Sequence, residues 1–170
     1  MLKRIVYSVS GAAIIGLGLF SFFAWNPAIE AVMPSVSTEY SSDVIEQGKK
    51  LASAGYCSTC HTIPSGMDYA GNYEMHTDFG TIYSSNITPD VETGIGTWSE
   101  AAFSRAMRQG ISRDGHHLLP AFPYEHFNKM TEDDITAIYA YIMTSVPAVK
   151  QIKKENSLPF PLNIRSLQAG

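Results

Sequence analysis

The chain has 170 residues, of which 45% are hydrophobic and 16% charged, and its 12 Lys and Arg against 16 Asp and Glu give a formal net charge of -4. This length suits one modest domain with an attached segment and excludes two full-sized cores. The acidic balance excludes a nucleic-acid binder with a basic surface, the apolar content excludes a disordered chain, and two cysteines exclude a disulfide-rich scaffold.

The N-terminal segment, residues 1–25, is predicted to be a transmembrane anchor. An uncharged apolar stretch at 5–25 directly follows Lys3 and Arg4. As a helix it spans about 30 Å, the thickness of the hydrocarbon core of a bilayer. Aromatic residues gather at its far end and no small-residue cleavage motif follows, so we expect a retained helix, with a cleaved signal as the alternative. The two basic residues predict a cytoplasmic N-terminus, with the rest of the chain across the membrane.

Residues 26–42 have the composition of a linker. They contain Pro27, Pro34 and five Ser or Thr residues, without helical periodicity. We expect a flexible linker that keeps the following domain, residues 43–170, close to the bilayer.

The first helix of this domain is predicted to follow Ser41 and Ser42. Its apolar positions repeat at helical spacing between residues 44 and 52. Gly48 lies in the middle of this stretch, where glycine costs about 1 kcal/mol relative to alanine. We therefore expect another element of the fold to approach closely at this glycine.

Two further helices are predicted from their N-terminal caps. Thr97 and Glu100 have the spacing of a capping box, which starts a helix that runs to about Gln109 and ends before Gly110. The third helix starts at Thr131. Before Pro147 it is expected to bury an apolar face that consists of Ile135, Ile138, Tyr139 and Ile142.

A long stretch rich in Gly, Pro, Thr and Asn separates the first two helices. So long a loop is uncommon in a compact domain unless something organises it. The sequence therefore predicts a bound group that orders this part of the chain.

The sequence CSTCH at 57–61 predicts what that group is. C-x-x-C-H is the attachment motif of c-type haem: Cys57 and Cys60 bind the two vinyl groups, and His61 presents a ring nitrogen to the iron. Both cysteines of the chain fall in this motif. A thioredoxin-like redox pair would need a βαβ context, and a zinc site would need two more Cys or His ligands at matching spacing. The sequence predicts neither, so we expect one covalent haem c.

Longer motifs resemble a known family. The opening, with Gly48, Leu51 and Ala52 before CSTCHT at 57–62, is similar to class I cytochromes c. The remainder resembles the membrane-associated cytochrome c subunits of bacterial alcohol, gluconate and aldehyde dehydrogenases. The similar stretches are FGTIYSSNITPDVETGIGTWSEAAF at 79–103, RDGHHLLPAFPYEHF at 113–127, MTEDDITAIYAYIM at 130–143 and LPFPLNIRSL at 158–167.

This resemblance implies a mainly α, class I cytochrome c fold around one covalent haem, preceded by the single N-terminal transmembrane helix. Together with the predicted anchor and its two basic residues, it implies a single-pass protein of the bacterial inner membrane with its haem domain in the periplasm. Its partners would be the membrane and redox proteins (a dehydrogenase, an oxidase or another cytochrome), and no nucleic acid. Many such subunits carry three haem domains, whereas this sequence stops where a second would begin, so we expect one haem.

The sixth iron ligand is predicted less directly. The family commonly supplies an axial methionine from a PAMPY segment, but residues 120–124 read PAFPY, and Phe122 cannot bind iron. We expect His126, which follows in the same loop, to take this place. The alternatives are Met130, Met143, His117 or an open position. A second imidazole would lower the reduction potential, whereas a thioether would raise it.

A few other residues allow two interpretations. Trp98, Asn86 and Arg113 are candidates for bonding the haem propionates and equally for ordinary structural roles. Tyr139 and Tyr141 are expected to pack in the core, one of them against Gly48, as in the helix crossing of cytochromes c.

No catalytic constellation competes with a haem protein in this sequence. We therefore expect an electron carrier and not an enzyme, passing single electrons from a periplasmic dehydrogenase or upstream carrier to a quinone-linked complex or terminal oxidase. One alternative is a haem-based gas sensor or peroxidase with an open sixth position. Another is a haem-relay subunit of a larger respiratory complex.

Overall fold

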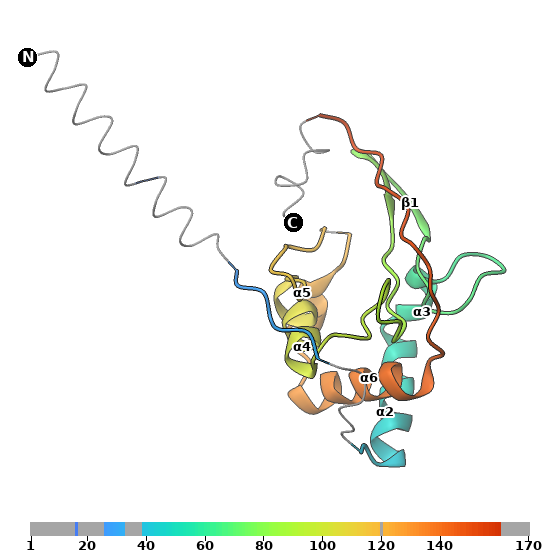
Figure 1. The fold of residues 1–170 in the computed structure, drawn as a ribbon, viewed down its shortest axis with the longest axis vertical. Coiled ribbons are helices and arrows are strands. Elements are labelled where there is room, and N and C mark those ends of the chain that lie inside the picture. Colours follow the sequence, from blue (N-terminus) through green and yellow to red (C-terminus); the bar gives the residue numbers. More distant parts are fainter. Residues whose placement is uncertain (1–15, 17–25, 33–38, 120, 161–170) are drawn as a thin grey trace, which may run out of the picture.

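The computed structural model describes residue 16 and residues 26–32, 39–119 and 121–160. This part of the chain is mainly helical and includes a short β-hairpin (Figure 1). In chain order its elements are α2 (Ser42–Ala54), α3 (Cys57–His61), β1 (Glu74–Thr77), β2 (Gly80–Tyr83), α4 (Glu100–Gln109), α5 (Tyr124–Phe127) and α6 (Glu132–Ser145). In Figure 1, α6 crosses α2, with α4 and α5 on one side of the domain and α3 and the hairpin on the other.

The crossing of α2 and α6 confirms the prediction made for Gly48. A Cβ atom at this position would lie 1.8 Å from the carbonyl oxygen of Ala137 and 2.9 Å from the Cβ of Tyr141. The two backbones are thus in direct contact, and glycine alone among the residues leaves room for this approach. Tyr141 is the tyrosine that packs there.

The core lies on the inner face of α6. Ile135, Ile138 and Ile142 are at most 1% exposed, and Tyr139 is also buried. Phe103 of α4 packs against Tyr139, with ring centroids 5.6 Å apart. Fully burying one such aliphatic side chain contributes about 1.5–3 kcal/mol, so this face accounts for much of the stability of the helical part. The apolar face predicted for the third helix is confirmed.

The helix caps agree with the sequence at two starts and differ at one. Ser41 caps α2, and Thr131 forms a complete capping box with Asp134 at the start of α6. At α4, however, the N-cap is Ser99, whose hydroxyl accepts from the Ala102 N–H at 3.2 Å. The predicted cap at Thr97 is therefore wrong, since the nearer serine already satisfies the first turn.

The glutamate expected in that capping box bonds to other elements instead. Glu100 accepts hydrogen bonds from the hydroxyl groups of Tyr40, at 3.0 Å, and Thr136 of α6. It therefore links α4 to α6 and to the segment before α2.

The long loop between α2 and α4 contains a hairpin that sequence reasoning missed. β1 and β2 pair antiparallel, with Glu74 opposite Tyr83 and Thr77 opposite Gly80. The outer edge of β2 is covered by the C-terminal segment, where Thr81 and Ser157 form an antiparallel bridge. The loop is thus organised in part by its own backbone pairing, and not by a bound group alone.

Two buried asparagines connect this loop to the C-terminal segment. Asn72 donates to the Ile152 carbonyl at 2.9 Å and accepts from the Lys154 N–H at 2.7 Å. Asn86 donates to the Val149 carbonyl at 2.7 Å. Because a buried backbone group without a partner is costly, these side chains fix the path of the segment that follows α6.

Residues 26–32 lie against the domain. The Ile29 N–H donates to the Arg113 carbonyl at 2.8 Å, and Arg105 of α4 donates to the Pro27 carbonyl at 2.7 Å. These contacts lie within the first part of the predicted linker, residues 26–32. The attachment is made through backbone carbonyl and N–H groups, which composition does not reveal.

The predicted membrane anchor, residues 1–25, falls outside the described residues except for Gly16, and so do residues 33–38 of the predicted linker. Among the helices that are described, none is both long and apolar enough to cross a bilayer.

Candidate haem-binding site

The C-x-x-C-H motif forms a short helix of its own, α3, directly after α2. α2 ends at Ala54, and Tyr56 takes a left-handed backbone conformation, with φ 57°, that turns the chain into Cys57. One helical turn separates Cys57 from Cys60, so both side chains belong to the same short element as His61. The motif therefore presents its two thiols and its imidazole from one rigid turn.

The Cys57 thiol does not have the properties of a redox-active cysteine, and the described residues near the motif form no metal site. Both cysteines are free, and burial raises the pKa of the Cys57 thiol to about 11. Reactive cysteines have lowered pKa values, so the thioredoxin-like alternative is not supported. Among the described residues no group of three His, Cys, Asp or Glu side chains is placed to hold a metal ion, so a zinc site is not supported there.

His61 is held in the form that an iron ligand requires. Its Nδ1 lies 2.6 Å from the carbonyl oxygen of Ser85. A carbonyl only accepts, so Nδ1 carries the proton and Nε2 keeps its lone pair. Burial lowers the pKa of this imidazole and outweighs the Ser85 bond, which acts in the opposite direction. A neutral histidine with a fixed tautomer fits the axial position of a haem.

Gly71 stabilises the positions of both His61 and Ser85. Its N–H donates to the His61 carbonyl at 2.7 Å. A Cβ at Gly71 would lie 2.4 Å from the carbonyl carbon of Ser85, and the residue has a φ of 79°. The position thus requires glycine for two reasons, close packing and a left-handed backbone. Gly71 keeps Ser85, and through it the ring of His61, in place.

The loop that includes the expected sixth ligand lies next to the motif. The rings of Phe122 and Phe127 stack on each other, with centroids 5.5 Å apart. Phe127 also lies against Gly55, where a Cβ would be 3.2 Å from its ring and 3.7 Å from the Sγ of Cys57. His126, the residue before Phe127, is exposed and lines a surface pocket together with Phe122. The expected ligand and the phenylalanine at the usual ligand position thus lie in the same short stretch of the loop.

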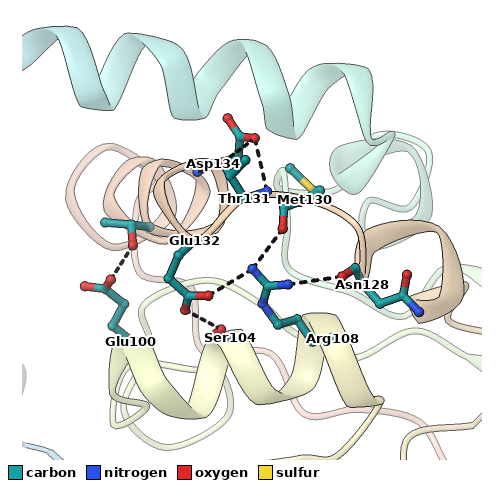
Figure 2. A network of polar contacts seen from close by, with 9 residues as sticks. Glu100, Ser104, Arg108, Asn128, Met130, Thr131, Glu132 and Asp134 are labelled. Atoms are coloured by element: carbon teal, nitrogen blue, oxygen red, sulfur yellow. Dashed lines mark hydrogen bonds and ion pairs between the residues drawn. The ribbon is translucent and has the colours of Figure 1, made fainter.

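The other candidate ligands have different surroundings. Met130 and Met143 are partly buried and pack against the hydrophobic core. In Figure 2 the side chain of Met130 lies toward α2 and its carbonyl toward α4. His117 is exposed, and its Nε2 lies 3.1 Å from the side-chain nitrogen of Asn26. Each of these three residues therefore already has a structural contact, whereas His126 is an exposed residue of α5.

The residues considered for the propionates have structural contacts. Asn86 is 3% exposed, and its side chain bonds to Val149, Thr93 and Thr88. Arg113 donates to the Ile29 carbonyl at 3.3 Å and pairs with Asp114 at 2.7 Å. Trp98 packs against the core. These contacts favour the structural reading of all three residues.

Comparison with known proteins assigns the chain to a family. The family model described as Cytochrome c matches residues 45–145, which is more than half of the chain. The chain belongs to the cytochrome c family. A covalent haem c is the cofactor that this family implies, and the residues of α3 fit it. Cytochromes c are electron carriers and not catalysts.

Several relatives carry the name of a dehydrogenase. A nicotinate dehydrogenase subunit of Pseudomonas putida is 48% identical over 164 residues, which cover 96% of this chain and 14% of the relative. The gluconate 2-dehydrogenase cytochrome c subunit of Pantoea cypripedii is 43% identical, covering 72% and 28%. The alcohol dehydrogenase (quinone) cytochrome c subunit of Gluconacetobacter polyoxogenes is 44% identical, covering 73% and 26%. The resemblance to dehydrogenase cytochrome subunits is confirmed, although the chain spans less than a third of the length of these relatives.

Sequence reasoning missed the residues that support His61. Ser85 acts through its backbone carbonyl, so its side chain gives no signal. Gly71 is one of 13 glycines in the chain, and nothing in the sequence distinguishes it. It also missed Arg108, whose contacts are with backbone groups of a distant loop.

Proposed function

We propose that this protein is a monohaem c-type cytochrome that carries single electrons between a dehydrogenase or upstream carrier and the respiratory chain. The observation that carries the proposal is His61, neutral and oriented by Ser85, on the same turn as two free thiols. Haem supplies reversible one-electron chemistry when bound, and the protein contributes attachment, axial ligation and exclusion of water. The names of its relatives support a dehydrogenase as the partner.

The number of haem groups follows from the cysteines. The chain has two cysteines, and both lie in α3. A second covalent haem would need a second pair. One haem per chain is therefore the stoichiometry we propose, with Cys57 and Cys60 as the attachment residues.

His126 is the sixth ligand that we propose, opposite His61. It lies in the same loop as Phe122, which takes the place of the family's usual methionine. The adjacent ring of Phe127 reaches Gly55 and the neighbourhood of Cys57. Met130 and Met143 instead pack in the core. Two imidazoles would give a lower reduction potential than the histidine and methionine pair typical of cytochromes c.

We also propose that residues 1–25 anchor the protein in the bacterial inner membrane, with the haem domain in the periplasm. The support is the uncharged stretch at 5–25, preceded by Lys3 and Arg4. Residues 26–32 then attach to α4 and its following loop, so the haem domain would stay close to the membrane surface.

The proposal is tested on the full chain matured with haem. We expect the mass of one haem bound covalently, a potentiometric titration with one single-electron wave, and only slow CO binding by the ferrous protein at neutral pH. Replacing Cys57→Ser or Cys60→Ser should each remove one thioether bond. If the matured chain carried no covalent haem, the proposal of a c-type cytochrome would be contradicted. Rapid CO binding by the native ferrous protein would favour a gas sensor or peroxidase.

A further inference from the structure

The guanidinium group of Arg108 lies at the point where the α5 loop returns to α6. Its Nη1 donates to the Asn128 carbonyl at 3.0 Å, and its Nη2 donates to the Met130 carbonyl at 2.8 Å. Nη2 also pairs with Glu132 at 2.9 Å (Figure 2). One side chain of α4 thus binds backbone and side-chain oxygens on three positions of the segment that follows His126.

The helix that includes His126 cannot maintain this position by itself. α5 has four residues and no side-chain N-cap, and so short a helix is not stable in isolation. It is attached to α4 at two points. At its start the ring of Tyr124 lies on Gly110, where a Cβ would be 2.7 Å from it. At its end stands Asn128, the C-cap, whose carbonyl accepts from Arg108.

The acceptors of Arg108 require an arginine. Three oxygens surround two guanidinium nitrogens in a fixed fork, which the single ammonium of a lysine cannot reproduce. The charge is balanced by Glu132, whose other carboxylate oxygen accepts from Ser104 at 2.7 Å. The arginine is therefore itself fixed from both α4 and α6, as Figure 2 shows.

We propose that Arg108 is a positioning residue for the sixth iron ligand: by holding the carbonyl groups of Asn128 and Met130, it keeps α5 and His126 in place opposite His61. The inference rests on the proposed ligation by His126. Arg108 also holds the carbonyl of Met130 toward α4, while the methionine side chain lies toward α2 (Figure 2).

Arg105 offers a matched control. It lies one turn earlier on α4 and also donates to backbone carbonyl groups, those of Pro27, Ser112 and Arg113. These carbonyls belong to the start of the same loop and to residues 26–32, and not to α5. Loss of Arg105 contacts should therefore weaken the fold without releasing His126.

The test compares the Arg108→Lys and Arg105→Lys variants with the native full chain, each matured with haem. The measured quantities are the fraction of ferric haem in the low-spin, two-imidazole form by EPR and the rate of CO binding by the ferrous protein. For Arg108→Lys we expect a roughly tenfold or greater rise in CO binding, the change that loss of one charge-assisted hydrogen bond produces. For Arg105→Lys we expect the native spectrum and the native CO rate, whatever the change in denaturation midpoint.

The possible failures are distinguishable. If the native protein has the two-imidazole spectrum and both lysine variants keep it together with the native CO rate, the positioning role of Arg108 is overturned alone. An equal rise in CO binding for both variants would also overturn it, since general loosening would then explain the effect. If the native protein itself lacks the two-imidazole spectrum, the ligation by His126 fails, and the inference fails with it.

Discussion

The crossing of α2 and α6 and the loop around α5 are held in place by different kinds of contact. At the crossing, two backbones meet at Gly48 and apolar side chains fill the space around them. Around α5, the Arg108 side chain of α4 binds backbone carbonyl groups of a loop with little regular structure. The stability of the first region therefore depends on close packing, and that of the second on hydrogen-bond donors. The crossing stabilises the fold, and the loop around α5 positions His126, the proposed iron ligand.

The largest expected effect is at the crossing itself. Gly48→Ala places a Cβ within 1.8 Å of the Ala137 carbonyl, which is backbone and cannot move aside. We expect α2 and α6 to separate, with a loss of about 3 kcal/mol or more in the free energy of unfolding. Chemical denaturation measures it. The exposed neighbour Lys49→Ala is the control and should change stability by less than about 0.5 kcal/mol. Equal stability of both variants would refute the close crossing.

A smaller loss of stability is expected where side-chain hydrogen bonds fix the segment after α6. Asn86→Ala removes bonds to the Val149 carbonyl, at 2.7 Å, and to the Thr88 N–H, at 2.9 Å. Leaving these groups without partners should cost about 2–3 kcal/mol. Amide exchange should accelerate in the segment after α6 more than in α2. Asn128→Ala is the control, because Asn128 bonds through its main chain and its side chain is exposed. Uniform acceleration across the domain would contradict a local role for Asn86.

The smallest effect is a pH dependence at the link between α4 and α6. The hydroxyl of Ser104, and then the charge of Arg108, lower the pKa of Glu132 from its ordinary value of 4.5. Because the folded pKa is the lower one, the stability from Glu132 is fully present above pH 4.5 and is lost as the pH falls through the folded pKa. The difference in denaturation midpoint between the native protein and Glu132→Gln should therefore shrink below pH 4.5. A difference that stays constant down to about pH 3 would exclude this contribution.

The same division explains what the sequence could predict. Gly48, the Thr131 cap and the α6 face are local patterns of volume and capping, and they can be recognised from neighbouring residues. The C-x-x-C-H motif is local too. In contrast, β1 has the polar sequence EMHT and gives no strand signal.

Contacts with main-chain oxygens also cannot be predicted from the side chains in the sequence. Ser85 contacts His61 across 24 positions of sequence, and Arg108 contacts Asn128 across 20, in both cases with a backbone carbonyl as the acceptor. The attachment of residues 26–32 was hidden for the same reason. The iron ligand predicted at His126 stays a prediction.

The central claim is that His61 and His126 are the two axial ligands of one haem c. Low-temperature EPR together with near-infrared magnetic circular dichroism on the ferric full chain tests it most directly. We expect a low-spin signature of two imidazoles in the native protein, replaced by a high-spin spectrum in His126→Ala. A methionine-to-iron charge-transfer band in the native protein, or a native spectrum retained by His126→Ala, would contradict the claim.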